Sequence, residues 1–216
     1  MVQVDEGILL ILCSSLLASS AYALIAPFFP LELEEKGVDE KYIGAIFSIY
    51  SIAVIVFSPP VGRYLELVGY TNMLIGGLAL MGADFIAFGF IGHLESAESV
   101  LYLSLFLRFM QGTAVAMTYT TIYAIITNNY PDRKAALLGM LEASFGVGLI
   151  FGPLVGSALF DTFGFAKTFY IYGGTFLVFT VLLYFCLPTI RQGGVRPGLP
   201  DPRFISASDV GGSVVQ

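Results

Sequence analysis

Six long apolar runs constrain the fold of this chain more than any other feature. A helix needs about 20 apolar residues to cross the ~30 Å hydrocarbon core of a bilayer. Runs of about that length cover residues 7–29, 42–61, 72–91, 100–127, 137–160 and 168–187. The pattern predicts an all-α membrane protein with six transmembrane helices, surrounded by lipid rather than by water.

The composition supports this interpretation and excludes one class of partner. Hydrophobic residues make up 56% of the 216 positions and charged residues 12%, about half of the charged share usual in soluble domains. With a mean hydropathy of +0.83, the chain holds more apolar surface than a globule of this size can bury. The 16 acidic and 10 basic residues give a net charge of −6, so we expect no nucleic-acid partner, which would need basic patches.

Residues for metal, cofactor or catalytic chemistry are scarce. Cys13 and Cys186 lie in apolar runs and His93 is the only histidine, so neither a metal site nor a disulfide framework is expected. The sequence has no Gly-x-Ser-x-Gly elbow, no His-Glu-x-x-His helix and no phosphate-binding loop, which are common signatures of enzymes. We therefore expect neither a cofactor nor an enzyme activity.

The two ends of the chain differ in character. Asp5 and Glu6 precede the first run, whereas a cleaved signal peptide begins with positive charge, so we expect the first span to be retained. Residues 189–216 are rich in Gly, Pro, Ser and Asp without an apolar period, which is typical of a disordered tail. The predicted organisation is a six-helix transmembrane domain over residues 1–188, followed by a disordered cytoplasmic tail.

Basic residues in the connections predict the orientation in the membrane. With the amino terminus in the cytoplasm, the cytoplasmic segments hold six of them: Arg63, Arg133, Lys134, Arg191, Arg196 and Arg203. The opposite side holds three: Lys36, Lys41 and Lys167. Because cytoplasmic connections carry an excess of Lys and Arg, both termini are predicted to be cytoplasmic. Vesicle, vacuole and plasma membrane are all left open as the location.

Three ionisable residues fall inside the predicted spans: Asp84, Arg108 and Glu142. Each costs at least ~2.5–3.5 kcal/mol at the centre of a membrane helix, so such residues mark candidate pathways for substrate or protons. On a helix, Arg108 shares one face with Gln111 and Tyr119. Arg108 then either ties down neighbouring carbonyls and acids or lines a cavity, where it would orient substrate or tune a nearby carboxylate.

The two acids each allow a structural and a functional interpretation. Glu142 lies about five residues into its span, where it either snorkels to the surface or handles protons or cations. Asp84, near the middle of the third span, either pairs with Arg108 or belongs to a buried polar cluster. Two acids against one base leave a net charge of −1 in the spans if all are ionised, which favours a cationic cargo or a proton.

Small residues mark the fifth span. Ser144, Gly148, Gly152 and Gly156 recur every four residues, which predicts a smooth ridge where another helix approaches closely. Pro153 removes a helical hydrogen bond and predicts a bend. The bend is a candidate gate, and close helix packing alone is the alternative.

The first span carries a weakly polar stripe. Ser15, Ser19 and Tyr22 line one face of an otherwise apolar helix. Serines in membranes often bond their own backbone, so the stripe alone is weak support for a pathway, in which Tyr22 is the candidate member.

Two of these segments resemble motifs of one transporter family, the major facilitator superfamily. Residues 108–112 (RFMQG) resemble its motif B, which belongs to the fourth span. Residues 148–156 (GLIFGPLVG) resemble the antiporter motif associated with proton-coupled export of drugs and amines. The resemblance covers residues 7–188.

The connection between the second and third spans carries a third resemblance to the superfamily. Gly62, Glu66 and Gly69 match its loop signature, whereas Tyr70 and Thr71 stand in place of the closing basic pair. This departure weakens the case for the charge latch that the loop usually makes.

Three segments are most similar to the vesicular amine and polyamine transporter branch: the loop that ends at Gly69 and Tyr70, the end of the first span with Pro27 and Pro30, and residues 141–159. The superfamily resemblance implies two six-helix halves with substrate held between them near the bilayer midplane. This chain supplies the first half only, so a second half, its own or another chain's, is an implied partner. Residues 189–216 then resemble the start of the connector between the halves.

The function implied is proton-coupled antiport of small organic cations (amines, polyamines or drugs) by alternating access. Arg108 and Gln111 would organise the cavity, and Glu142 would exchange protons against cargo. The fifth helix would bend at its glycines during the switch. Two alternatives remain open: a facilitative carrier of sugars or of organic anions that pair with Arg108, and a non-transporting half-size subunit of a larger complex.

Overall fold

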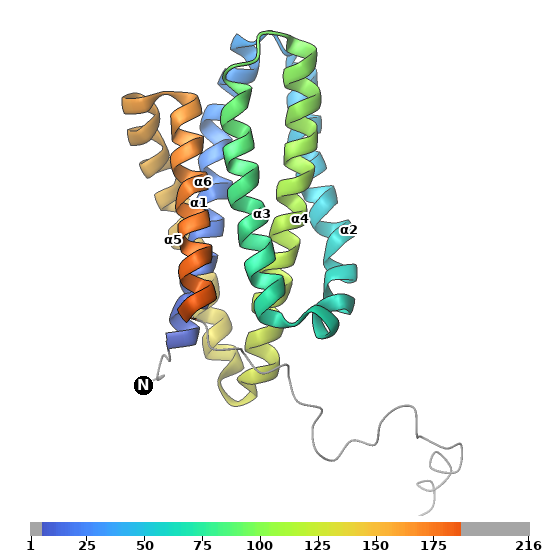
Figure 1. Ribbon diagram of the computed structural model, residues 1–216, viewed down its shortest axis with the longest axis vertical. Coiled ribbons are helices and arrows are strands. Elements are labelled where there is room, and N and C mark those ends of the chain that lie inside the picture. Colours follow the sequence, from blue (N-terminus) through green and yellow to red (C-terminus); the bar gives the residue numbers. More distant parts are fainter. Residues whose placement is uncertain (1–5, 187–216) are drawn as a thin grey trace, which may run out of the picture.

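The computed structural model describes residues 6–186 as a bundle of six helices (Figure 1). They are α1 (Glu6–Glu35), α2 (Ile43–Val68), α3 (Tyr70–Ile91), α4 (Ala97–Asn129), α5 (Lys134–Phe163) and α6 (Phe165–Cys186). Single 3-10 turns, Glu40–Tyr42 and Pro131–Arg133, precede α2 and α5. All six helices are long and apolar enough to cross a membrane, and residues 6–186 contain no strand. The predicted all-α membrane fold is confirmed.

Several helices run beyond the predicted spans. α1 continues through Pro27 and Pro30 to Glu35, so residues 30–35, which lie beyond the first predicted span, are helical as well. α2 likewise continues through Gly62 and ends at Val68. An apolar run marks where a helix meets lipid rather than where its hydrogen bonding ends. Prolines are tolerated in membrane helices because neighbouring groups satisfy the backbone atoms that they leave unpaired.

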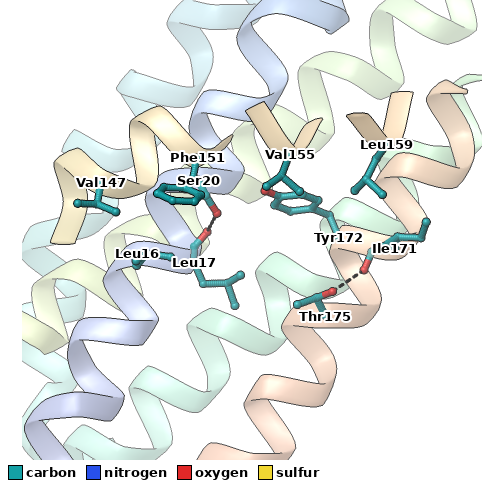
Figure 2. Close-up of a pocket in the computed structure, with 10 residues that line it drawn as sticks. All are labelled: Leu16, Leu17, Ser20, Val147, Phe151, Val155, Leu159, Ile171, Tyr172 and Thr175. Atoms are coloured by element: carbon teal, nitrogen blue, oxygen red, sulfur yellow. Dashed lines mark hydrogen bonds between the residues drawn. The ribbon is translucent and has the colours of Figure 1, made fainter. Parts of the chain in front are cut away.

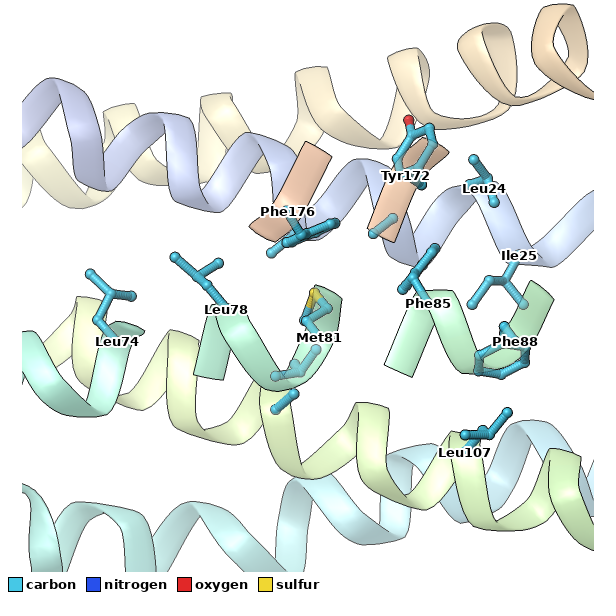
Figure 3. Packing of buried hydrophobic residues seen from close by; sticks show 14 of the residues in the cluster. Leu24, Ile25, Leu74, Leu78, Met81, Phe85, Phe88, Leu107, Tyr172 and Phe176 are labelled. Carbon is cyan, nitrogen blue, oxygen red and sulfur yellow. The ribbon is translucent and has the colours of Figure 1, made fainter. Parts of the chain in front are cut away.

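The helices pack mainly in pairs. α1 lies along α5, α2 along α4, and α3 along both α4 and α6. Aromatic side chains fill the space between α1, α3 and α6 (Figure 3). The ring centroids of Phe85 and Phe176 are 5.8 Å apart, and those of Phe88 and Phe29 are 5.2 Å apart. α2 and α5 have few buried residues, so most of the core lies on the other four helices.

The helices alternate in direction along the bundle (Figure 1). The α2–α3 and α4–α5 connections lie at the end where α1 begins and α6 ends. The other three connections lie at the opposite end. The first residue of α1 and the last residue of α6 therefore lie on the same side of the bundle. The predicted tail, residues 189–216, lies outside the described part of the chain.

Candidate substrate site

A cavity of about 360 Å³ opens between α1, α2, α4 and α5. Its lining residues are Ala18, Ser19, Tyr22, Tyr50, Val54, Val115, Tyr119, Tyr123, Glu142 and Phe145. Three of the candidates predicted from the sequence, Tyr22, Tyr119 and Glu142, come to it from three different helices. The cavity is therefore the place where the predicted pathway residues meet.

Four tyrosines surround this cavity. The rings of Tyr22 and Tyr50 are 5.3 Å apart, and those of Tyr119 and Tyr123 are 6.5 Å apart. The Tyr119 hydroxyl donates a 3.2 Å hydrogen bond to the Ser15 carbonyl, which ties α4 to α1 and orients the ring. Because the face of an aromatic ring attracts cations, this lining favours a positively charged group.

Glu142 supplies the acidic group of the cavity. The Tyr123 hydroxyl on α4 donates a 2.5 Å hydrogen bond to its Oε1 atom. The side chain of Glu142 is exposed in the six-helix unit, and the cavity lining contains no Lys or Arg. The only formal charge in the lining is therefore negative.

Arg108 lies behind the cavity rather than in its lining. Its side chain is 1% exposed, and its guanidinium carbon lies 4.2 Å from the centroid of the Phe47 ring and 5.4 Å from that of Tyr50. Nη1 donates a 2.7 Å hydrogen bond to Gln111 Oε1. Since Tyr50 both contacts Arg108 and lines the cavity, one aromatic ring separates the buried charge from the cavity.

Asp84 lies on α3, outside the cavity lining, and is 4% exposed. Within residues 6–186 neither carboxylate oxygen of Asp84 has a hydrogen-bond partner, and no ion pair joins it to Arg108. Asp84 is therefore a buried acid without a direct partner in the described part of the chain, and both sequence-based interpretations of it stay predictions.

The small-residue ridge of α5 packs against α1. Gly148, Gly152 and Gly156 are buried. A Cβ atom added at Gly148 would collide with the Ser19 hydroxyl, and one added at Gly152 would collide with the Ser20 carbonyl. The two backbones are thus too close for any side chain larger than that of glycine.

Ser144, at the start of the small-residue ridge, and Pro153 are the other two residues of α5 singled out from the sequence. The Ser144 hydroxyl donates a 2.7 Å hydrogen bond to the Leu12 carbonyl of α1. Pro153 lies inside an uninterrupted helix, where its ring leaves the Leu149 carbonyl without a helical donor. The gating bend at Pro153 stays a prediction.

The residues that match the superfamily's loop signature lie in the last turns of α2 and at Gly69, the single residue between α2 and α3. Gly69 has a φ of +88° between the two helices, a conformation that favours glycine. Gly62 and Glu66 lie on exposed positions in the last turns of α2. Tyr70, where the superfamily's basic pair would begin, is buried, and its hydroxyl accepts a 2.9 Å hydrogen bond from Asn128 Nδ2. A neutral contact therefore joins the start of α3 to the end of α4.

Tyr70→Phe is expected to lower the free energy of unfolding by about 1 kcal/mol, because it removes one partly buried hydrogen bond without changing the shape of the ring. Thermal unfolding in detergent measures the effect. The control is Tyr64→Phe on the exposed side of α2, which is expected to change stability by less than about 0.5 kcal/mol. Equal effects of the two variants would show that the contact with Asn128 does not stabilise the fold.

A larger cavity, about 560 Å³, lies between α1, α5 and α6 (Figure 2). Its lining residues are Leu16, Leu17, Ser20, Val147, Phe151, Val155, Leu159, Ile171, Tyr172 and Thr175. The hydroxyls of Ser20 and Thr175 are engaged by carbonyls of their own helices. With no charged residue in its lining, this cavity is the weaker candidate for a charged cargo.

Sequence reasoning missed Phe47, Tyr50, Tyr123 and Phe145. Aromatic residues are ordinary in an apolar run, so nothing in the pattern distinguished Phe47, Tyr50 or Phe145. Tyr123 follows Tyr119 by four residues, one turn further along the face that begins at Arg108. Continuing that face by one turn would have found it.

Six membrane-length helices, four of which line an acidic, aromatic cavity, define a polytopic membrane protein with room for a small molecule. The family model described as Major Facilitator Superfamily matches residues 11–208. The chain belongs to this superfamily, whose members are transporters rather than enzymes. The predicted membership is confirmed.

Curated relatives include transporters from animals and bacteria. The human MFS-type transporter SLC18B1 is 30% identical over 171 residues, covering 79% of this chain and 38% of the human protein. The multi-drug resistance efflux pump PmrA of Streptococcus pneumoniae serotype 4 is 27% identical over 176 residues, covering 79% and 42%. The tetracycline resistance protein, class B, of Escherichia coli is 29% identical over 147 residues, covering 66% and 34%. The chain thus spans less than half the length of these relatives and matches their N-terminal half.

Proposed function

We propose that this chain forms the first half of a carrier that exchanges small organic cations against protons by alternating access. The observation that carries the proposal is the cavity around Glu142, where one carboxylate and four tyrosines face an opening of about 360 Å³. Similarity to a multi-drug efflux pump supports export of small molecules as the direction of transport.

The lining favours a cation over an anion. A carboxylate pairs with an ammonium group, and each aromatic ring over a cation adds about 0.5–2 kcal/mol. Arg108 lies behind Tyr50, with its guanidinium against Phe47 and Gln111, so it offers no donor to an anion in the cavity. An anion entering the cavity would meet the charge of Glu142 instead.

Glu142 supplies the proton site of the exchange. Its carboxylate binds either a proton or an ammonium group, since protonation removes the charge that holds the cargo. The hydrogen bond from Tyr123 strengthens when the carboxylate is ionised. Coupling further requires that proton and cargo each bind the two conformations differently, and a bend of α5 at Pro153 would supply that difference.

A second six-helix half would close the cavity. α2 and α5 border it, and both carry exposed apolar side chains, with Ile55 72% exposed and Ile150 71% exposed. The two halves of such carriers face each other across the substrate site. We place the second half, whether from the same chain or another, over these faces of α2 and α5.

Both termini of the six-helix unit lie on the cytoplasmic side in this proposal. Arg63, Arg133 and Lys134 lie near the end of the bundle where α1 begins, and Lys36, Lys41 and Lys167 lie near the opposite end. The two ends are therefore balanced within the described residues. The tail's Arg191, Arg196 and Arg203 favour the cytoplasm for the end where α1 begins.

Three ligands of one shape test the sign of the cargo: phenethylamine, phenethyl alcohol and phenylacetate, which are positive, neutral and negative. Calorimetric titration of the full chain in lipid nanodiscs is expected to show binding of the amine at least about tenfold tighter than that of the alcohol, because the ion pair and the rings act on the charge alone. Phenylacetate is expected not to bind.

The outcomes of this titration distinguish a carrier of organic cations from a carrier of organic anions and from a non-transporting subunit. Preferred binding of phenylacetate would overturn the proposal in favour of a carrier for organic anions that reach Arg108. Binding of none of the three ligands, together with co-purification of other membrane proteins at a fixed ratio, would overturn it in favour of a non-transporting subunit.

A further inference from the structure

The larger cavity, between α1, α5 and α6, is a long groove that the proposed exchange does not use. One wall of this α5–α6 groove is formed by one residue from each of four successive turns of α5: Val147, Phe151, Val155 and Leu159 (Figure 2). Side chains of α1 and α6 form the rest of the lining. At about 1.5 Å of helix per residue, the groove is about 18 Å long.

The α5–α6 groove lies at the depth of a single leaflet. α5 begins at Lys134 and ends at Phe163, so the groove runs from the middle of the helix to about one turn before its end. That end of the bundle is opposite the start of α1 (Figure 1). Half of the ~30 Å hydrocarbon core is about 15 Å, so the length of the groove matches the reach of the acyl chains of one leaflet.

The α5–α6 groove is too narrow for a helix. A volume of about 560 Å³ spread over about 18 Å gives a mean cross-section of about 30 Å², less than half that of a helix with a diameter of about 10–12 Å. The groove therefore has room for one extended hydrocarbon chain, and not for a helix from a second copy or from the second half.

The lining of the groove suits hydrocarbon. It contains no charged residue, and the hydroxyls of Ser20 and Thr175 are engaged by carbonyls of their own helices. Val147, Phe151 and Val155 are exposed in the six-helix unit, at a depth where lipid surrounds the protein. Because an empty groove loses dispersion contacts with its lining atoms, a chain that fills it is favoured.

The groove and the candidate substrate site lie on opposite sides of the contact between α1 and α5. On α5, Glu142 lines the substrate site and Val147 lines the groove, with the buried face of Gly148 and Gly152 between them. α6 contributes no residue to the substrate site. A second half that closes the substrate site therefore leaves the opening between α5 and α6 facing lipid.

A basic residue lies at the mouth of the groove. Lys167 is exposed and precedes Ile171 of the lining by four residues, so it lies on the same side of α6, one turn nearer the end of the bundle. Lipid headgroups lie at that level, and an ammonium group forms a charge-assisted hydrogen bond to a phosphate. Asp161 follows Leu159 by two residues and so lies on another side of α5.

We propose that the α5–α6 groove is a phospholipid-binding site. One acyl chain, from the leaflet opposite the start of α1, occupies the groove, and the phosphate of the same lipid pairs with Lys167. The chain packs between α5 and α6, which contact each other far less than α5 contacts α1. Since only the folded bundle has the groove, the bound lipid stabilises it.

Photo-crosslinking of the full chain in phosphatidylcholine nanodiscs tests the site without any transport. A small fraction of the lipid carries a diazirine in its acyl chain, and mass spectrometry maps the label. In the wild type, Phe151 and its groove neighbours are expected to carry at least about threefold more label than Phe106, because a chain in the groove meets protein on several sides. Phe106 is 58% exposed on α4, in the same half of the bundle.

Two tryptophan variants test whether the label reports the groove. Val155→Trp fills the groove and is expected to reduce the label on Phe151 to the level found at Phe106. Phe106→Trp places the same indole on the exposed surface and is expected to leave the groove label unchanged. Equal labelling of groove and surface in the wild type would overturn the inference, whether or not Val155→Trp folds. Unchanged groove label in a folded Val155→Trp would also overturn it.

A diacylglycerol with the same diazirine chain tests the role of Lys167. Because it has no phosphate, it is expected to label the groove of the wild type about threefold less than the phospholipid does, in the range of an exposed charge pair. Lys167→Gln is expected to remove this difference. Equal labelling by the two lipids in the wild type would contradict the pairing of Lys167 with the phosphate.

Thermal unfolding in detergent gives a second measurement. Added phosphatidylcholine is expected to raise the unfolding temperature of the wild type, because a ligand that binds only the folded chain stabilises it. The rise is expected to be smaller for Val155→Trp and unchanged for Phe106→Trp. An equal rise in all three proteins would show that the lipid acts elsewhere on the surface and would overturn the inference.

Discussion

Glu142→Gln is expected to reduce proton-driven uptake of phenethylamine to the background of empty vesicles. The amide keeps the shape of the side chain and can still accept a hydrogen bond from Tyr123, but it neither ionises nor binds a proton near neutral pH. Uptake into proteoliposomes under an imposed pH gradient measures the effect. Circular dichroism of the same sample is expected to show unchanged helix content, because Glu142 is exposed in the cavity rather than packed in the core.

Two further variants serve as a control for Glu142→Gln and as a test of its hydrogen bond. Glu95→Gln removes an exposed acid from the α3–α4 connection and is expected to leave uptake unchanged. Tyr123→Phe removes the donor to Glu142 and is expected to lower uptake about tenfold, in line with ~1.5 kcal/mol for a hydrogen bond to a charged group. Full activity of Glu142→Gln would remove Glu142 from the mechanism.

Gly148→Ala is expected to destabilise the protein by about 3 kcal/mol, since overpacking of this severity forces backbones apart. The added Cβ atom would collide with the Ser19 hydroxyl and lie 2.5 Å from the Leu16 carbonyl. α1 and α5 must then separate along their whole contact. Thermal unfolding in detergent measures the loss.

Gly146→Ala is the matched control for this substitution. It lies two residues earlier on the same helix, and a Cβ atom added there meets nothing within 4 Å. Alanine in a helix is favoured over glycine by about 0.5–1 kcal/mol, so this variant is expected to be as stable as the wild type or slightly more so. Equal losses in the two variants would contradict the close approach of α1 and α5.

The sequence predicts the number of helices better than their ends, for a physical reason. The thickness of the bilayer sets the length of an apolar run, so six such runs predict six membrane-spanning helices. Helix ends depend on local chemistry instead. α2 and α3 are separated only by Gly69 with its positive φ, although ten residues in this region, 62–71, read as a connection.

In the candidate site, contacts within one helix could be predicted from the sequence, whereas contacts between helices could not. The contact between Arg108 and Gln111 follows from a spacing of three residues on one helix. The bond between Tyr123 and Glu142 joins two helices, and helical periodicity says which face a residue occupies but not which helix lies opposite. Tyr50 lies in a mostly apolar run without a polar face, so the packing of α2 against α4 is what brings it to the cavity.

Thiol labelling tests most directly whether the cavity is a water-filled, negatively charged pathway. A cysteine introduced as Val54→Cys in the lining, with Cys13 and Cys186 replaced by serine, is expected to react faster with a cationic methanethiosulfonate than with an anionic one. Phenethylamine is expected to slow that reaction, and Glu142→Gln to remove the preference for the cation. Val178→Cys, exposed on α6 away from the cavity, is expected to be unreactive in lipid. Equal rates for the two reagents, or no reaction at Val54→Cys, would contradict a cation pathway through this site.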